Sequence, residues 1–433
     1  MTSDFKNLLT EYVALKSIST DPQYKGEMLK TAEWIKAYLQ KFGFTVEFIQ
    51  GSTCNPVVFG SLTTNISLPT VLIYGHYDVQ PSDQFDLVEI DGRLVGRGVV
   101  DNKGQNLIHI YTVCKLAQEK KLKYNIKFLI EGNEETGNDD MSDLLRLHKD
   151  KLKSDIVLVS DGEIAGENPC IEVSLRGGFN CRLVYTTAKT NVHSGLFGGA
   201  IPNAAYEMAK FLNKLQTPDN QINIPGFYDG VDNISNSERQ NNIQMGKIAD
   251  NLIHDIGVTT YLTEPDTDFF TQTGLRPTIQ ITGIKSGYIG DGYANIVPAT
   301  AEARLNFRLV KSQEADNIIS KLREFVKQNT PDYIKYELIV GSPHNPVKLN
   351  ISNPIFGSTI SLLEQSFGQP ILMKNVGGAI PFVSDIKEIF GVDTLLVPLA
   401  NDDCNMHGDN ENFRIDLIDK GLQFSEKFFT MSS

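Results

Sequence analysis

The stretch VLIYGHYDVQP, residues 71–81, decides the fold of this chain. Its first four residues, Val71–Tyr74, form an apolar run of the kind found in buried parallel strands. Two polar residues, His76 and Asp78, follow at the predicted end of that strand. Because the carboxyl ends of parallel strands face one crevice in an open α/β sheet, residues that are distant in the sequence can meet there.

Other acids and a second histidine mostly follow similar runs. We predict strands at Ile126–Ile130 and Ile156–Val159 from the same apolar texture. A later apolar run, Thr394–Leu399, precedes a loop that contains a histidine. Beside His76 and Asp78, the residues of this recurring pattern are Asp101, Glu134, Glu135, Asp161 and His407. Together they offer enough carboxylate and imidazole ligands for two divalent metal ions.

His76, Asp78 and Asp101 each allow a metal-related and a structural interpretation. Residues two apart on an extended segment point to the same side, so Asp78 can hold the second ring nitrogen of a metal-bound His76. Pairs of this kind are nevertheless often incidental or structural. Asp101 can bind one ion with each carboxylate oxygen, and its structural alternative is a helix N-cap.

Glu134 and Glu135 are adjacent at the predicted end of a strand. Neighbouring acids repel unless a cation or a proton intervenes, so one can bind metal while the other acts as a general base. The alternative is a solvated loop, and Asp161 and His407 taken singly also allow a structural role. The repeated placement at strand ends favours the metal interpretation for the whole set.

Composition limits the class of protein. The chain has 433 residues and a mass of 48.1 kDa, so two domains are expected. A net charge of −13 and a pI near 5.1 argue against nucleic-acid and anionic-membrane partners, which need a basic face. Five cysteines without CxxC spacing, no secretory signal and no long apolar stretch predict a soluble cytoplasmic protein.

The order of predicted elements indicates an α/β domain interrupted by a second domain. Strands and helices alternate at first, the texture changes near Arg176–Gly178, and the alternation resumes after about residue 310. We therefore predict one domain from residues 1–176 and 311–433, and an inserted domain at 177–310. Helices are predicted at 28–42, 141–152, 203–215, 243–256, 312–328 and 354–367, and strands at 179–187, 277–283, 301–310 and 333–340.

The motifs occur in an order that points to a family. GHYDVQP, GRGVVDNKG, EGNEETG, SDGE, NVHSGLFGG and GGAIP resemble the di-metal hydrolases that include carnosine dipeptidases, acetylornithine deacetylase and succinyl-diaminopimelate desuccinylase. The resemblance extends from about residue 10 to the C-terminus. It implies a catalytic α/β domain with a mixed, largely parallel sheet flanked by helices, of the aminopeptidase/phosphorylase-like type. It also implies an inserted α+β domain that forms a lid and dimerises.

The resemblance implies roles for the acids and histidines. His76, Asp101 and Asp161 match the ligands of one metal ion, and Asp101, Glu135 and His407 match the ligands of the other. Glu134 matches the general base, with Asp78 as a catalytic residue beside His76. Zn²⁺ suits these mixed ligands, with Mn²⁺ or Co²⁺ as alternatives.

Residues for substrate binding are implied as well. HSGLFGG at 193–199 looks like the dipeptidase branch, and His193 is implied to polarise the oxyanion in the partner subunit of a homodimer. Arg308 matches the arginine that binds the substrate carboxylate, although Arg304 lies on the same predicted strand face. Asn295, Gly377, Gly378 and Ala379 are further implied contacts. NVGGAIP at 375–381 replaces the family's frequent REGGSIP, which leaves the substrate's identity open.

The expected reaction is metal-dependent hydrolysis of short peptides with a free C-terminus, above all dipeptides, by a metal-activated water with Glu134 as base. An N-acyl-amino-acid deacylase using the same chemistry is the first alternative. A non-catalytic dimeric protein that binds metal or peptide is the second, although such a protein would need no base. Nucleotide binding is not favoured because GRGVVDNKG lacks the GxxxxGK[ST] spacing.

Overall fold

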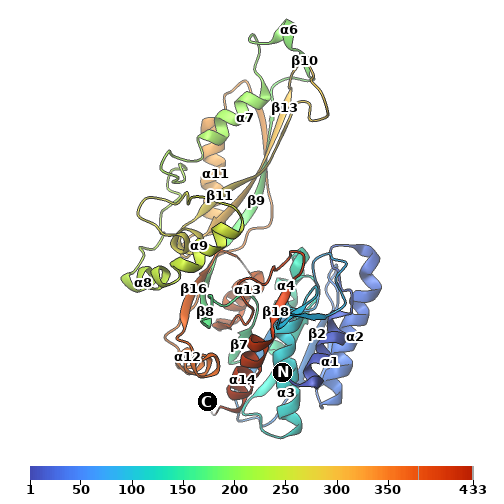
Figure 1. The fold of residues 1–433 in the computed structure, drawn as a ribbon. Helices are drawn as coiled ribbons and strands as arrows, with labels where there is room; N and C mark the ends of the chain where they lie inside the picture. The colour runs from blue at the N-terminus through green and yellow to red at the C-terminus, as the bar shows by residue number, and fades with distance from the viewer. Residues whose placement is uncertain (379, 432–433) are drawn as a thin grey trace. The chain divides into compact units, whose positions relative to one another are not determined.

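The stretch 71–81 contains most of β3 (Thr70–His76), an interior strand of a mixed sheet in the computed structural model (Figure 1). The structure describes residues 1–378 and 380–431. The chain divides into two units. Unit 1 comprises Met1–Val173, Leu349–Lys374 and Asp385 onwards, and unit 2 comprises Ser174–Lys348 and Asn375–Ser384.

The sheet of unit 1 has the strand order β1–β2–β6–β3–β7–β17–β8. Its centre is parallel, since β6, β3, β7 and β17 all run in one direction, whereas β1 and β2 are antiparallel at one edge. The carboxyl ends of the central strands therefore lie at one edge of the sheet. The strands are β1 (Thr45–Ile49), β2 (Val57–Leu62), β6 (Asn125–Glu131), β7 (Ile156–Val159), β17 (Thr394–Leu396) and β8 (Cys170–Leu175), to which β15 (Val347–Lys348) and β16 (Leu372–Val376) are paired.

Helix α3 (Lys103–Gln118) is buried along most of its length, with contacts to β3, α1 and α14. Its buried residues lie on all sides and include polar side chains such as Gln105, Asn106 and His109, so the helix shows little amphipathic pattern. The other helical elements assigned mainly to unit 1 are α1 (Ser3–Val13), η1 (Pro22–Tyr24), α2 (Lys25–Lys41), η2 (Glu134–Thr136), α4 (Met141–Leu147), α5 (Lys149–Leu152), α12 (Pro354–Phe367), α13 (Pro381–Phe390) and α14 (Ile415–Thr430). A small sheet joins β18 (Asn412–Arg414), β5 (Arg93–Val95) and β4 (Val88–Ile90).

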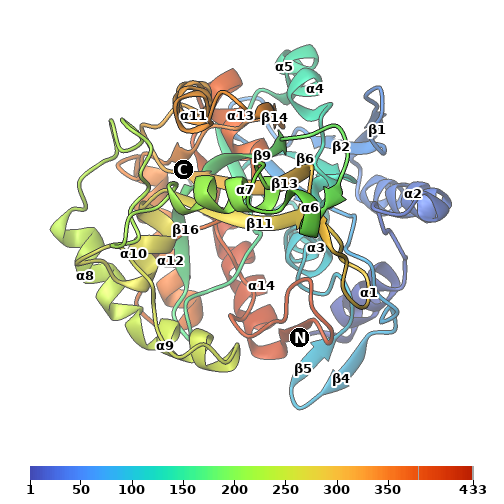
Figure 2. The same ribbon diagram turned by 90° about the horizontal axis from the view of Figure 1, so that it is seen from above.

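Unit 2 is built on an antiparallel sheet with the order β11–β13–β9–β14. Side chains of β9 (Gly177–Thr186) and β13 (Thr300–Leu309) largely alternate between buried and more exposed, as a sheet with one covered face requires. The covered face packs against α7 and α11 (Figures 1 and 2). The remaining elements are β10 (Val192–His193), α6 (Ser194–Phe197), α7 (Ala204–Asn213), α8 (Asn236–Gln244), α9 (Gly246–Asp255), α10 (Phe269–Leu275), β11 (Thr278–Ser286), β12 (Ile296–Val297), α11 (Ala315–Asn329) and β14 (Lys335–Val340).

Two glycines allow a close approach of two segments in unit 2. A side chain on Gly177 would meet the main-chain nitrogen of Pro346 at 2.4 Å, and one on Gly178 would meet the carbonyl oxygen of Phe307 at 2.1 Å. Without those side chains, the N–H groups of Gly178 and His344 each donate to the other's carbonyl, at 2.9 and 3.0 Å. The RGG sequence near 177 thus marks a point where backbone must touch backbone.

The mixed α/β fold, with its largely parallel centre, confirms the predicted fold class. Most predicted helices and strands are present within a few residues, but the predicted helix 141–152 is two short helices that meet at His148. The unit boundary also differs from the predicted 310. Unit 2 continues to Lys348 because β14 pairs with β9 and α11 packs on the same sheet. Within residues 1–378 and 380–431, no helix is both long and apolar enough to cross a membrane.

Candidate active site

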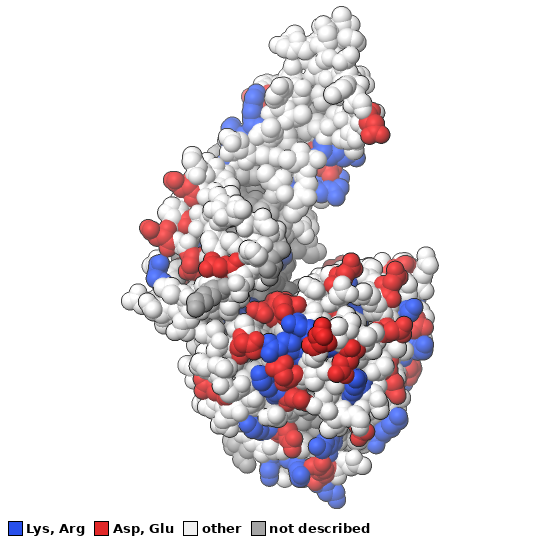
Figure 3. Space-filling model, in the orientation of Figure 1, with Lys and Arg blue, Asp and Glu red and all other residues white. Residues whose placement is uncertain are grey.

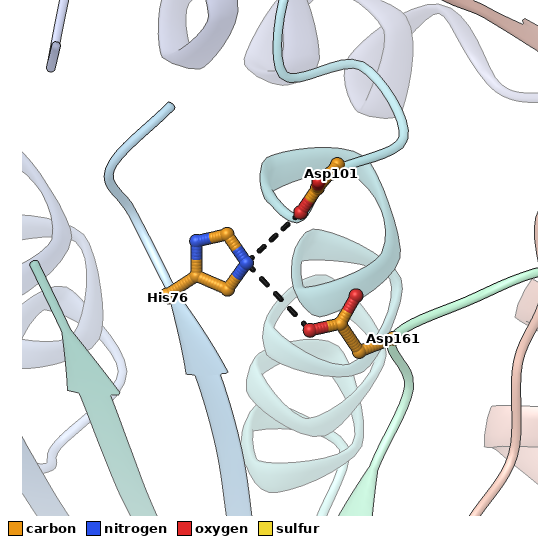
Figure 4. A group of neighbouring side chains, drawn as sticks. All are labelled: His76, Asp101 and Asp161. Atoms are coloured by element: carbon orange, nitrogen blue, oxygen red, sulfur yellow. Dashed lines mark ion pairs between the residues drawn. The ribbon is translucent and has the colours of Figure 1, made fainter. Parts of the chain in front are cut away.

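Three of the predicted ligands meet at the carboxyl edge of the sheet in unit 1. His76 is the last residue of β3, Asp161 follows β7, and Asp101 precedes α3. The Nε2 atom of His76 lies 2.9 Å from Asp101 Oδ1 and 3.6 Å from Asp161 Oδ2, and Figure 4 shows both carboxylates directed at that nitrogen. One ligand atom from each residue lies within 4.8 Å of the others, which is close enough to share one ion.

A second group shares Asp101 with the first. The Nε2 atom of His407 lies 2.7 Å from Asp101 Oδ2 and 3.2 Å from Glu135 Oε2. The ligand atoms of these three residues again lie within 4.8 Å of one another. Asp101 therefore presents one oxygen to each group, which is the geometry that a shared carboxylate ligand requires.

Asp78 supports both His76 and the turn that carries the two glutamates. The Nδ1 atom of His76 lies 3.0 Å from the main-chain oxygen of Asp78 and 3.3 Å from its carboxylate. The same carboxylate accepts hydrogen bonds from the N–H groups of Glu134 at 3.3 Å and Glu135 at 3.1 Å, and from the Ser19 hydroxyl at 2.7 Å. One buried carboxylate thus fixes the imidazole ring and the start of the following turn.

The carboxylates of the two metal-ligand groups favour positive charge in their surroundings. Hydrogen bonds to Asp101 and Glu135 raise the pKa of His407 to about 10. Burial lowers the pKa of His76, but its contacts with carboxylates outweigh burial and raise that pKa well above its usual value. Burial raises the pKa of Glu134. Closely spaced carboxylates favour positive charge between them, and a divalent ion would supply it.

Two buried ligand atoms fit a cation. His76 Nε2 and Glu135 Oε1 have no hydrogen-bond partner among the described residues, although carboxylates lie close to the imidazole nitrogen. Buried polar atoms normally have a partner, so these orphaned atoms are suited to a metal ion. Imidazole nitrogens and carboxylate oxygens are a suitable donor set for Zn²⁺, Mn²⁺ or Co²⁺.

Unit 2 contains a cationic group, which we define as Arg176 and Arg308, and the imidazole of His344 lies close to Arg308. Burial lowers the pKa of Arg308. Burial, and then the charge of Arg308, lower the pKa of Arg176 to about 10 and lower that of His344. No carboxylate among the described residues forms an ion pair with either arginine. The cationic group is therefore suited to an anionic ligand.

Arg176 also holds the loop predicted to contact substrate. Its Nε donates to the carbonyl of Gly377 at 2.9 Å, and its main-chain N–H donates to the carbonyl of Gly378 at 3.0 Å. A side chain on Gly377 would approach the Arg176 guanidinium to 3.0 Å. The third residue predicted for this loop, Ala379, lies outside the described residues.

The remaining predicted residues lie elsewhere in unit 2. His193 is exposed at the end of β10, where the carbonyl of Asn295 accepts a hydrogen bond from the Ser194 N–H at 2.9 Å. Arg304 is largely exposed and pairs with Glu302 at 2.9 Å. Arg304 thus forms an ion pair at the surface, whereas Arg308 on the same strand is partly buried.

Several residues of these sites are not predictable from the local sequence. The sequence indicates Arg176 only as part of the change in the pattern of predicted elements near residues 176–178. Nothing in the sequence links His344 to Arg308. Glu411, four residues after His407, and Arg97 form a buried ion pair beside the metal-ligand groups. An acid so close to a predicted ligand was the only available signal.

A mixed α/β fold with two acid and histidine groups at the carboxyl edge of its sheet is suited to a metal-dependent hydrolase. The profile of peptidase family M20/M25/M40 matches residues 72–430, and the chain belongs to that family. The protein is accordingly a metallopeptidase, which confirms the resemblance found in the sequence.

Similar proteins cover nearly the whole chain. Human Beta-Ala-His dipeptidase is 26% identical over 99% of this chain and 90% of its own length. Cysteinylglycine-S-conjugate dipeptidase of Corynebacterium striatum is 26% identical over 93% of this chain and 90% of its own. The crystal structure of human carnosine dipeptidase 1 superposes with a TM-score of 0.82 at 26% identity, over 99% of this chain and 96% of that one.

We expect the metal-free protein to bind two equivalents of Zn²⁺ or Mn²⁺ and to unfold at a higher temperature when loaded. An ion that binds only the native state adds about 2.7 kcal/mol at a hundredfold excess over its Kd. Asp101→Ala should weaken both equivalents, whereas Asp143→Ala, at an exposed acid on α4, should bind like the parent. Elemental analysis and thermal denaturation measure both effects. Two tight equivalents in Asp101→Ala would exclude a shared ligand.

Proposed function

We propose that this protein is a dipeptidase that hydrolyses short peptides with a free C-terminus and uses two divalent metal ions, Zn²⁺ by preference. The observation that carries this proposal is the sharing of Asp101 between two ligand groups, with Glu134 in the adjoining turn. His76 and Asp161 would complete the first metal site, and Glu135 and His407 the second. The names of the similar proteins, which are dipeptidases, support the choice of substrate class.

The roles of the residues follow from their chemistry. Two bound ions would polarise the scissile carbonyl and acidify the attacking water. Glu134 would take the proton from that water and return it to the leaving amine. Burial raises the pKa of Glu134, which brings its proton affinity closer to that of a base working near neutral pH. Asp78 would keep the His76 ring in its orientation through the ring's Nδ1 atom.

Replacing the base should abolish catalysis without removing metal. We expect Glu134→Gln to lower kcat about 10²–10⁴-fold, because the amide cannot accept the proton, and to bind metal like the parent. The assay is a panel of dipeptides, tripeptides and N-acetyl amino acids, with the protein loaded, chelated and reloaded.

The panel also separates the competing functions. Metal-restorable cleavage of dipeptides agrees with the proposal, whereas cleavage of N-acetyl amino acids alone would assign a deacylase. A metal-loaded parent that cleaves nothing in the panel would favour a binding protein. Full activity in Glu134→Gln would remove that residue from the mechanism.

We propose that the cationic group binds the carboxylate at the C-terminus of the peptide. Arg308 offers a guanidinium fork that matches a carboxylate, and no acid of the described chain neutralises it. The carbonyls of Gly377 and Gly378 accept hydrogen bonds from Arg176, so the loop that contains these glycines would be held beside the bound carboxylate. Asn295 would provide a further polar contact.

Arg308→Ala should raise KM for a dipeptide and lower kcat/KM by roughly 10–100-fold, the value of a lost charge-assisted hydrogen bond. The defect should be much smaller for the same dipeptide with an amidated C-terminus, because that substrate has no carboxylate to lose. Arg304→Ala is the matched control, since it removes an exposed arginine from the same strand. Equal defects on both substrates would contradict carboxylate binding.

We propose that the protein forms a homodimer through unit 2, in which His193 polarises the oxyanion in the partner subunit. Strand β11 has one described neighbour, β13, so its other edge is open to pairing. An apolar tip, made of Leu196, Phe197, Tyr288, Ile289 and Tyr293, is exposed in the same unit. Figure 3 shows few charged side chains on the visible surface of this end of unit 2. Exposed apolar patches of this kind mark interaction surfaces.

Mixing two inactive variants tests the contribution in trans. His193→Ala and Glu134→Gln subunits should each be inactive alone, but a heterodimer contains one site with both an intact base and an intact partner histidine. Activity should therefore return in heterodimers purified through two different tags. If verified heterodimers stay inactive, His193 does not act in trans.

We also propose a cytoplasmic location. All five cysteines are free, and four of them are buried, as in proteins that fold under reducing conditions. Fractionation of the source cells, with antibody detection of the chain, tests this location directly.

A further inference from the structure

A buried ion pair joins the segment before Asp101 to the loop that carries His407. Arg97 and Glu411 are only 3% and 1% exposed, and Arg97 Nη1 donates to Glu411 Oε2 at 2.8 Å. The two residues are separated by 314 positions in the sequence. Burying two charges is costly unless further hydrogen bonds satisfy them, so their other contacts are informative.

The carboxylate of Glu411 is saturated by the backbone of the Asp101 segment. Its Oε2 accepts from the N–H of Gly98 at 2.9 Å, and its Oε1 accepts from Val100 at 2.8 Å and Asp101 at 3.0 Å. With the Arg97 bond, that makes four donors on one carboxylate. Glu411 therefore fixes the main chain of the residue shared by both ligand groups.

The second terminal nitrogen of the Arg97 guanidinium contacts the loop that carries His407. Its Nη2 donates to the carbonyl of His407 at 3.1 Å and to that of Gly408 at 3.0 Å. His407 has a φ of 62°, and Asn405 and Asn410 have φ values of 54° and 58°. Left-handed backbone is uncommon for residues other than glycine and persists where surrounding contacts hold it. Arg97 supplies such contacts at His407 itself.

We propose that Arg97 and Glu411 form a positioning clamp that sets Asp101 and His407 for the metal ion shared with Glu135. This inference rests on the proposed metal centre and adds a role for two residues outside its ligands. Neither clamp residue offers its charged group to an ion, because Glu411 is occupied by four donors and Arg97 is cationic. The clamp acts by fixing ligands in advance, as residues behind metal ligands do.

The clamp should affect the two ions unequally. It holds one of three ligands in the group of His76, Asp101 and Asp161. It holds two of three ligands in the group of Asp101, Glu135 and His407. Loosening it should therefore weaken the second group more than the first. A residue that merely stabilised the fold would not separate the two affinities.

The test compares Glu411→Gln with Asp403→Asn. Glu411→Gln keeps the shape but removes the charge and replaces one acceptor oxygen with a donor. Asp403→Asn makes the same change in the same loop, where Asp403 pairs with Arg93 at 2.7 Å. Metal-free proteins are titrated with Zn²⁺ against a competing chelator, and the unfolding temperature is measured without metal. Arg97→Lys is a second variant, which keeps the charge but removes the second arm of the guanidinium.

In Glu411→Gln we expect one equivalent to lose roughly 10–100-fold in affinity while the other changes less, and excess Zn²⁺ to restore hydrolysis. Asp403→Asn should match the parent. If Glu411→Gln does not fold, the same pattern is required of Arg97→Lys. Equal losses at both equivalents, or unchanged affinities, would overturn the clamp. A parent that binds fewer than two ions would instead overturn the metal centre on which it rests.

Discussion

The site depends on one constraint, which is the repulsion among carboxylates gathered at the edge of a sheet. Asp78 and Asp161 follow the neighbouring parallel strands β3 and β7, Asp101 precedes α3, and Glu134 and Glu135 lie in the turn after β6. Acids so close together require positive charge. The carboxylates accordingly raise the pKa of both His76 and His407. Metal binding is the use that best explains why a fold would maintain such an arrangement.

Several buried contacts oppose that repulsion by fixing each acid separately. Asp78 is held by two backbone N–H groups and a serine, and the Asp101 segment is held by Glu411. These contacts come from the backbone or from buried polar groups, so the ligands would lose little freedom on binding an ion. The conformational entropy of these acids is therefore lost when the chain folds and not when the ion binds.

Unit 2 carries the opposite charge where it is predicted to meet substrate. Arg308 and Arg176 lack acidic partners in the described chain, and the loop after β16 is held by Arg176 in place of the charged pair frequent in the family. Near the end of β16, just before that loop, Asn375 accepts a buried hydrogen bond from Ser174 at 2.7 Å. At residues 375–381, where this sequence departs from REGGSIP, a hydrogen bond between neutral side chains is therefore present. The carboxylate of the substrate would then depend on Arg176 and Arg308.

The sequence by itself determined the central strands, the acids at their ends and the family, because apolar runs and the residues that follow them are local in the chain. The sequence distinguished Arg308 from Arg304 as the arginine for substrate binding only through the family resemblance, because both residues lie on one face of the same strand. The tertiary structure decided that residues 311–348 belong to unit 2, because β14 must pair with β9. It also decided that Arg97 meets Glu411 and that Gly178 meets His344. Such contacts join residues more than a hundred positions apart, and no local pattern encodes them, since they exist only once the strands and loops have packed.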